Sequence, residues 1–225
     1  MEFKEDLQKA VAELKKEPAR KFDQSVDLII NLQKFDVKKT PINMFISVPH
    51  KIKDKKICGF LEIKNENLDT ITKSEFKRYS TKQEIKKLAR AYDFFIAQAS
   101  LMPVVATSFG RALGPTGKMP SPQLGILMNV DDKAIKELKN KINSSVKIKV
   151  KEASVKIQIA KQSMKDEEIV ENILTVYNAL LKILTRGKEN VKNVEVKLTM
   201  SKPQKIKIRW KTTQKHMFQN KKRKL

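Results

Sequence analysis

The sequence predicts two domains, a discontinuous α+β domain and an α/β domain that is inserted into it. Two patterns lead to this prediction. Near both ends of the chain, in Ser25–Leu32 and again after Ser144, apolar residues alternate with polar ones as in half-buried strands. From Lys56 on, short apolar strands alternate instead with helical patterns, which is typical of an α/β layer.

The domain boundaries follow from where these patterns change. We expect residues 1–53 and 146–210 to form the discontinuous α+β domain, and residues 54–145 to form the insertion. The two pieces that flank the insertion each combine helix and strand, and neither is complete alone. Residues 211–225 have no apolar period and are rich in lysine, which predicts a flexible basic tail.

The first piece is expected to begin with a helix that ends at Glu17-Pro18, followed by strands over Ser25–Leu32 and 44–50. In the insertion, Thr81 and Glu84 form a capping box before a helix. The other elements expected there are strands over 57–63 and 93–98, a short helix after the second strand, a loop rich in glycine and proline over 109–123, and a helix over 133–142.

The last piece returns to alternating strands around one long helix. We expect strands over 146–150 and 155–159, a helix over 166–186 with Gly187 as its C-cap, and strands over 194–200 and 205–210.

Charge gives the strongest indication of function. The chain has 225 residues, of which 40% are hydrophobic, so a core can form, yet its net charge is +23. A charge this large indicates a nucleic-acid partner, the alternative being a basic soluble protein without one. Because only 6% of the residues are aromatic, base-stacking sheets are disfavoured, and we expect a folded RNA that is recognised by shape, phosphates and 2′-hydroxyls. No acidic residue follows Glu195, so the basic end either becomes ordered on RNA or is a solvated tail or targeting signal.

Several other classes of site are excluded. The stretch FGRALGPTGKMPSPQ (109–123) is not a phosphate-binding P-loop, because Ala112 stands where the first glycine is needed and Met119 where a hydroxyl is needed. Cys58, the single cysteine, is expected to be a buried inert thiol, and with His50 and His216 it makes no zinc set. We expect no metal, no cofactor and no membrane-spanning segment.

Six blocks of the chain together resemble the ribosomal large-subunit protein one family in its archaeal form. They are ARKFDQSVDL (19–28), SVPH (47–50), YDFFIAQASLMP (92–103), LGPTGKMP (113–120), MKDEEIVENI (164–173) and VKLTMSKPQ (196–204). The blocks occur in the family's order and span most of the chain, with the basic tail outside them.

The resemblance implies the two-domain fold with a Rossmann-like insertion, and a cytoplasmic, ribosome-bound protein. Such a protein would be a non-enzymatic constituent of the large ribosomal subunit that binds the mobile stalk of the large-subunit rRNA. It would also assist release of the exit-site tRNA and repress translation of its own mRNA.

The resemblance also implies which residues contact RNA. The family's contact positions fall on two segments, and the adjacent cations can neutralise phosphate. These residues are Arg20, Lys21, Phe22, Gln24, Ser25, Asp27, Thr199, Met200, Ser201 and Lys202. A second candidate contact with rRNA or tRNA, or else a purely architectural loop, comprises Arg111, Gly114, Gly117 and Lys118.

Some of these residues have a plain structural alternative. Phe22 is as compatible with the core as with RNA, and Asp27 could simply pair with a lysine. Ser201 replaces the family's usual glycine, so either the backbone there avoids glycine-only conformations or its approach to RNA is relaxed.

Two other classes of function compete with a ribosomal RNA-binding protein. A DNA-architectural protein would fit the charge but not the six blocks. An RNA-modifying enzyme would need a cofactor motif or a cluster of acid–base residues, and the sequence has neither GxGxxG nor a histidine–carboxylate group.

Overall fold

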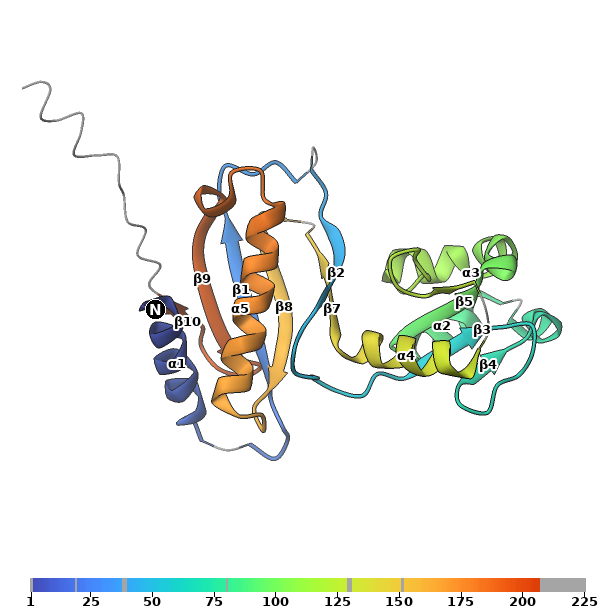
Figure 1. Cartoon of the computed structure of the whole chain (residues 1–225), viewed down its shortest axis with the longest axis horizontal. Coiled ribbons are helices and arrows are strands. Elements are labelled where there is room, and N and C mark those ends of the chain that lie inside the picture. Colours follow the sequence, from blue (N-terminus) through green and yellow to red (C-terminus); the bar gives the residue numbers. More distant parts are fainter. Residues whose placement is uncertain are drawn as a thin grey trace, which may run out of the picture.

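The computed structural model describes residues 2–18, 20–37, 40–79, 81–128, 131–150 and 152–206 (Figure 1). This part of the chain is a mixed α/β structure with one parallel and two antiparallel sheets. The tail expected over 211–225 and the end of the strand expected over 205–210 lie outside the described residues.

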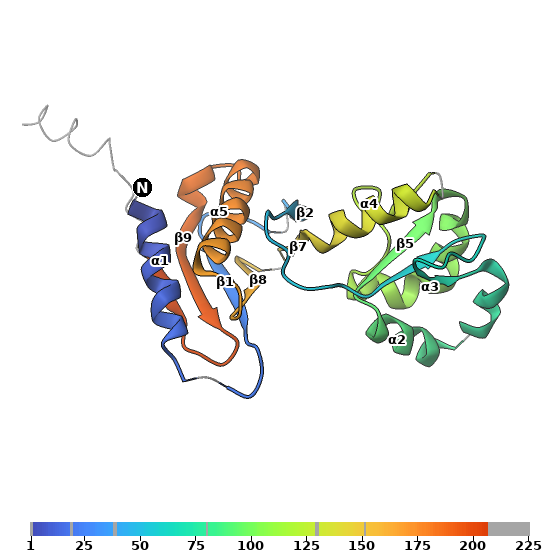
Figure 2. The ribbon, with the colours of Figure 1, turned by 60° about the horizontal axis from the view of Figure 1, so that its bottom comes forward.

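The first sheet is antiparallel, with strand order β10-β9-β1-β8. Helices α1 and α5 lie next to each other over one of its faces (Figures 1 and 2). The bounds are α1 Glu2–Lys15, β1 Ser25–Leu32, β8 Ser154–Lys161, α5 Asp166–Ile183, β9 Val191–Leu198 and β10 Gln204–Ile206.

The alternating pattern of β1 explains how it occupies the centre of this sheet. Every second residue is buried, and Leu28 and Ile30 are fully buried under the two helices. The residues between them, such as Asp27, stay partly exposed on the opposite face. The predicted half-buried strand over Ser25–Leu32 is therefore confirmed, as is the helix expected before Pro18.

A two-stranded antiparallel sheet connects this region to the rest of the molecule. It consists of β2 (Asn43–Ser47) and β7 (Ser145–Lys149), with Ser47 opposite Ser145. The next residue continues the pairing, because the Val48 N–H donates to the Ser144 carbonyl at 2.7 Å. The chain therefore leaves and re-enters the first region at adjacent points (Figure 1).

The third sheet is parallel, with strand order β4-β3-β5-β6, and has helices on both faces. Helices α2 and α3 pack with Phe60 and Phe95 on one face, and α4 packs with Ile57 and Ile96 on the other. The bounds are β3 Ile57–Phe60, β4 Asp69–Ile71, α2 Lys82–Ala91, β5 Phe94–Gln98, α3 Met102–Thr116, β6 Ile126–Leu127 and α4 Asp132–Asn143. Two 3-10 helices, η1 Lys73–Tyr79 and η2 Ala99–Leu101, belong to the same part of the chain. A third, η3 Gly187–Asn190, lies between α5 and β9.

The loop predicted over 109–123 is wrong in its first half, because α3 continues to Thr116. Phe109 and Leu113 are fully buried, and this apolar stripe packs against Phe60 and holds the segment helical. Pro115 lies in the last turn, where its missing N–H removes a single helical hydrogen bond and only Thr116 follows it in the helix. Gly117 then ends the helix at φ +70°, a left-handed conformation that favours glycine.

Other predictions differ in detail from the structure. Helix α5 ends at Ile183, with Leu184 as its C-cap in an extended conformation, and Gly187 instead opens the 3-10 helix η3 at φ +51°. The short strands β4 and β6 were not expected, because too few residues form them to give an alternating pattern. Cys58 is buried as expected, and burial raises the pKa of its thiol to about 12.

The predicted capping box of α2 is present and can be tested by mutation. The Thr81 hydroxyl accepts from the Glu84 N–H at 3.4 Å, and the Glu84 carboxylate accepts from the Thr81 N–H at the same distance. We expect Thr81→Ala to lower the free energy of unfolding by about 1 kcal/mol. Thermal unfolding monitored by circular dichroism should then show a melting temperature about 2–4 °C lower than that of the wild type.

Thr107→Ala is the matched control, because this exposed threonine lies inside α3 and its hydroxyl donates only to nearby carbonyls of the same helix. Alanine is the better helix former there, so no loss is expected. Equal melting temperatures for the two variants would contradict a stabilising role for the capping box.

Candidate nucleic-acid interface

The two predicted contact segments lie side by side at one end of the first sheet. Strand β1 begins at Ser25, and its partner β9 ends at Leu198, which is opposite Val26. Residues 20–27 and 199–202 therefore meet at the lower end of this sheet in Figure 1, although they are far apart in the sequence.

Thr199 joins these two segments through the backbone of Ser25. The Thr199 N–H donates to the Ser25 carbonyl at 3.0 Å, and the Thr199 hydroxyl accepts from the Ser25 N–H at 3.1 Å. The hydroxyl also donates to the same carbonyl at 3.3 Å. One lone pair of the hydroxyl oxygen is then left for a ligand, so the main contribution of Thr199 is to hold the two segments together.

Gln24 lies inside this end of the sheet, with only 1% of its surface exposed. Its side-chain oxygen accepts from the Met200 N–H at 3.2 Å, and its backbone carbonyl accepts from the Gln162 N–H at 2.8 Å. Because a buried amide is costly unless it is hydrogen-bonded, these contacts restrict the loop that carries Met200. Gln24 thus shapes the surface from below.

Two apolar side chains are exposed on the surface that these contacts support. Phe22 is 52% exposed and Met200 is 59% exposed, so Phe22 is not a core residue. Exposed large apolar groups at neighbouring loops are typical of a binding surface. The flat ring and the flexible thioether can both contact a sugar or the edge of a base.

Three cations lie within two residues of these two apolar groups in the sequence. Arg20, Lys21 and Lys202 are exposed, and within the described part of the chain none of them forms an ion pair. Asp27 faces Lys197 across the strand pair. Burial raises the pKa of Asp27, and the positive charge of Lys197 lowers it in part. In the described structure the two side chains do not form an ion pair of 4 Å or less.

The backbone at Ser201 does not need glycine. Lys34 is the one non-glycine residue with positive φ among the described residues, so Ser201 adopts a conformation open to any residue. Its hydroxyl accepts from the Leu198 N–H at 2.8 Å and stabilises the turn after β9. The structure therefore supports the first alternative for this position, a backbone that avoids glycine-only conformations.

A third segment, residues 161–165, belongs to the same surface and was not predicted. The Asp23 carboxylate accepts from the Ser163 N–H at 3.1 Å and from the Ser163 hydroxyl at 3.0 Å. The Lys161 ammonium donates to the Asp23 carbonyl at 3.2 Å. No local sequence pattern marks Ser163, because its position depends on the pairing of β8 with β1.

Comparison with known proteins decides the family. The model of the Ribosomal protein L1p/L10e family matches residues 14–202, which is most of the chain. The chain belongs to this family. Members are structural proteins of the ribosome rather than enzymes, so the expectation of a non-enzymatic protein is confirmed.

Similar proteins come from archaea, in agreement with the archaeal form that the sequence blocks indicated. The relatives carry the name large ribosomal subunit protein uL1, and three of them illustrate the similarity. The protein of Pyrococcus abyssi is 35% identical over 218 residues, which cover 90% of this chain and 97% of the relative. Those of Nanoarchaeum equitans and Methanothermobacter thermautotrophicus are 35% and 36% identical, each over 80% of this chain and 90% and 88% of the relatives.

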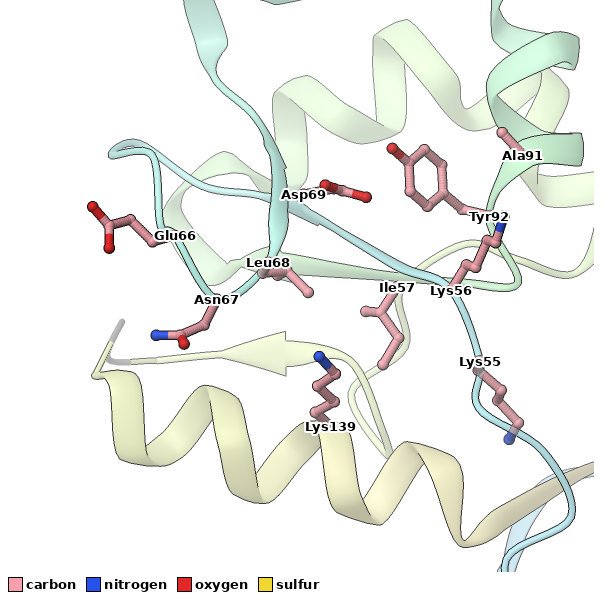
Figure 3. Close-up of a pocket in the computed structure, with 10 residues that line it drawn as sticks. All are labelled: Lys55, Lys56, Ile57, Glu66, Asn67, Leu68, Asp69, Ala91, Tyr92 and Lys139. Carbon is pink, nitrogen blue, oxygen red and sulfur yellow. The ribbon is translucent and has the colours of Figure 1, made fainter.

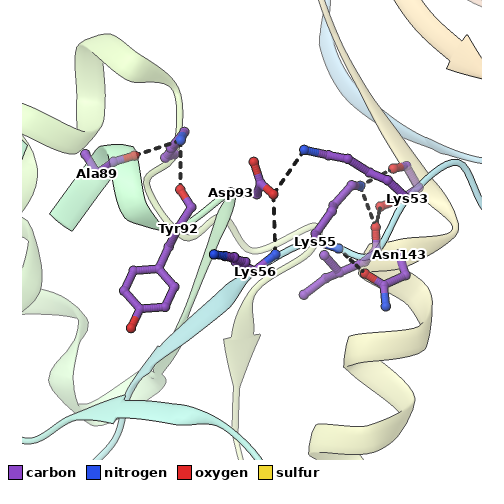
Figure 4. Close-up of polar contacts among 10 residues, drawn as sticks. Lys53, Lys55, Lys56, Ala89, Tyr92, Asp93 and Asn143 are labelled. Atoms are coloured by element: carbon purple, nitrogen blue, oxygen red, sulfur yellow. Dashed lines mark hydrogen bonds and ion pairs between the residues drawn. The ribbon is translucent and has the colours of Figure 1, made fainter. Parts of the chain in front are cut away.

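The family's LGPTGKMP block has a structural explanation in this chain. The Lys118 ammonium donates to the carbonyls of Ala89 and Tyr92 at 2.7 and 2.8 Å, the end of α2 (Figure 4). A cation at the C-terminus of a helix compensates the partial negative charge of its free carbonyls. Gly114 lies inside α3, and Gly117 is its C-cap. Of the four residues named for the second RNA or tRNA contact, Arg111 is therefore the exposed cation.

Two further lysines bind helix ends near the β2–β7 pair. Lys55 donates to the carbonyls of Ile142 near the end of α4 and of Ser145 at the start of β7 (Figure 4). Lys147 of β7 donates to the Gly117 carbonyl at the end of α3. Burial lowers the pKa of Lys55 to about 8, and it also lowers that of Lys147. These lysines stabilise the junction and are not free for RNA.

A cavity of about 440 Å³ opens at the amino ends of β3 and β4 (Figure 3). Lys56, Asp69 and Tyr92 line it, and burial raises the pKa of Tyr92 to about 12. In open α/β sheets ligands bind at the carboxyl ends of the strands, so this cavity is at the wrong edge for a cofactor crevice. In the described ranges no group of three or more His, Cys, Asp or Glu side chains could hold a metal ion, and none of the described helices is long and apolar enough to cross a membrane.

The contact between Thr199 and Ser25 gives a specific prediction. In Thr199→Ala the Ser25 N–H loses its partner, and we expect this amide to exchange with solvent at least about tenfold faster, a free-energy change of about 1.4 kcal/mol or more. Hydrogen exchange followed by NMR measures this directly. Thr199→Ser keeps the hydroxyl and should leave the Ser25 amide protected, and equal exchange in the alanine and serine variants would rule out the hydroxyl as its partner.

Proposed function

We propose that this chain is a structural constituent of the large ribosomal subunit and that it binds the folded stalk of the large-subunit rRNA. One observation supports this most strongly: exposed Phe22 and Met200 lie among unpaired cations, on loops that Gln24 and Thr199 hold in place. Family membership and the name of the archaeal relatives agree with the proposal.

The proposed interface comprises Arg20, Lys21, Phe22, Ser25, Asp27, Thr199, Met200, Ser201 and Lys202, with Gln24 below it. Cations contact phosphates and position the RNA, while the apolar groups and hydroxyls contact sugars and base edges. Because the loops are already ordered by internal hydrogen bonds, binding loses less conformational entropy than it would with mobile loops.

The proposal includes the further roles that the sequence blocks imply. Within the ribosome, the protein would contact the exit-site tRNA and assist its release, and free protein would repress translation by binding a similar fold in its own mRNA. One RNA-binding surface serves both rRNA and mRNA in this scheme, so the two RNAs compete. The protein would be cytoplasmic and ribosome-bound.

We also propose the division into a discontinuous α+β domain, residues 1–53 and 146–210, and a Rossmann-like insertion, residues 54–145. Three apolar clusters support it. One draws only on residues before Pro49 and after Ser144 together with the partly buried Ile52, whereas the other two draw only on residues between Ile57 and Ile142. Because β2 and β7 are paired, the chain ends left by removing the insertion lie close together, and a short linker can join them.

The main test measures binding of a hairpin with the sequence of the stalk rRNA. Removing the ring in Phe22→Ala is expected to weaken binding about tenfold, since contact between an aromatic side chain and a nucleotide contributes about 1–3 kcal/mol. Met200→Ala should act in the same direction. The logarithm of the affinity should also fall steeply with the logarithm of salt concentration, because several phosphate contacts release counterions.

Met128→Ala is the matched control for Met200→Ala, because Met128 is 83% exposed but belongs to the part of the chain around the parallel sheet. It should bind the hairpin like the wild type. If Phe22→Ala and Met200→Ala also bind like the wild type while remaining folded, the proposed interface is wrong. A DNA duplex that competes as well as the hairpin would favour a DNA-architectural protein.

The domain division is tested by a spliced chain that joins residues 1–53 to 147–225 through a short glycine linker. We expect it to fold cooperatively and to keep the hairpin affinity within about fivefold, a loss of roughly 1 kcal/mol or less. The full chain is the reference, and Phe22→Ala in the spliced chain is the control for binding at the same surface. A spliced chain that folds but no longer binds would place the main RNA contact in the insertion.

A further inference from the structure

A basic groove lies between α2 and α3, away from the end of the first sheet. It encloses about 670 Å³ and is lined along one side by Lys82, Lys86 and Arg90 of α2, and on the other by Arg111 of α3. The α2 residues are four positions apart, so they form a row on one side of the helix. At 1.5 Å per residue, this row is about 12 Å long.

The four cations of this groove are free of partners. All four are exposed, and none has an ion pair or a hydrogen bond to another residue in the described ranges. The groove lining includes no carboxylate. Four like charges around one hollow repel each other, and a bound polyanion would remove this repulsion.

The floor of the groove allows a ligand to approach closely. It is made of small side chains, with Ala89 5% and Ala112 8% exposed, and of Pro115. Lys118 at one end has its ammonium bound to the last carbonyls of α2. These carbonyls, which would otherwise repel a phosphate, are therefore already neutralised.

We propose that the α2–α3 groove is a second RNA-binding site that takes the sugar–phosphate backbone of an RNA helix. A nucleic-acid strand carries one phosphate per roughly 3.4 Å of axis, so a 12 Å row of cations faces several consecutive phosphates. A single phosphate or nucleotide fits less well, because it would engage only part of the row of cations, which is about 12 Å long.

The chemistry of the groove determines what it recognises. Its free polar groups are long cations that reach phosphates, since the Thr116 hydroxyl donates to the Leu113 carbonyl at 2.8 Å. No aromatic side chain lines the groove, so it does not read base sequence. The site rests on the proposed function only in that the polyanion is taken to be RNA. It replaces the second candidate contact of Arg111, Gly114, Gly117 and Lys118, because Arg111 is the one of these four that has a free cation lining the groove.

The test uses the full chain with its first site saturated by an unlabelled stalk hairpin. Binding of a labelled RNA duplex of unrelated sequence, about 16 base pairs long, is then measured as a function of salt. The groove variant combines Lys82→Gln, Lys86→Gln, Arg90→Gln and Arg111→Gln. The control variant removes the same charge from exposed residues of α4 by Lys133→Gln, Lys136→Gln, Lys139→Gln and Lys141→Gln.

We expect the groove variant to bind the duplex at least about tenfold more weakly, with a salt slope smaller by about 2–3, since each phosphate contact contributes about 0.9 to the slope. The α4 variant should lose less than about twofold, a change within roughly 0.4 kcal/mol. Because both variants keep the basic residues after 206, a difference between them is specific to the groove.

Two results would overturn the groove site: equal weakening in both variants, which would reflect net charge alone, or no second duplex bound by the saturated wild-type protein. Both variants should bind the stalk hairpin like the wild type. If the wild-type protein fails to bind the hairpin, the proposed function is wrong, and the groove is still tested by the duplex on the unsaturated protein. The two proposals therefore fail in distinguishable ways.

Discussion

The pairing of β1 with both β8 and β9 is the constraint on which the candidate interface depends. Strand β1 is the only strand with two long antiparallel neighbours in the described structure, and its first residue lies opposite Lys161 on one side and is bonded to Thr199 on the other. Three segments from distant parts of the sequence meet there. Their apolar groups and cations form one surface because the register of two strand pairs places them at one end of the sheet.

Hydrogen bonds inside this end of the sheet then fix the loops that the pairing brings together. Gln24, Thr199 and Asp23 each bind the backbone of a different segment. Polar side chains that are used in this way are unavailable for many contacts with RNA, but they hold the exposed Phe22 and Met200 in position. Buried Gln24 and exposed Phe22 thus lie two positions apart in one sequence block, with the first holding the surface from inside and the second exposed on it.

Two groups of lysines in this chain have different physical roles. Lys55, Lys118 and Lys147 bind the carbonyls at the ends of α4, α2 and α3, so their charge stabilises the junction near β2 and β7. Lys21 and Lys202 at the sheet end, and Lys82 and Lys86 in the α2–α3 groove, are instead exposed without partners in the described structure. The net charge alone does not distinguish the two groups, because every lysine adds one positive charge to it whether or not it is bound within the protein.

Local patterns in the sequence were sufficient for elements that local energetics determine. The alternation in Ser25–Leu32 predicted β1 and its buried face, and Thr81 with Glu84 predicted the start of α2. The tertiary structure decided what depends on contacts between distant residues: burial of Phe109 and Leu113 extends α3 through a stretch rich in glycine and proline, Gln24 is inside, and Ser163 joins the surface. Backbone preferences and apolar period act within a few residues, whereas burial and strand register depend on the whole chain.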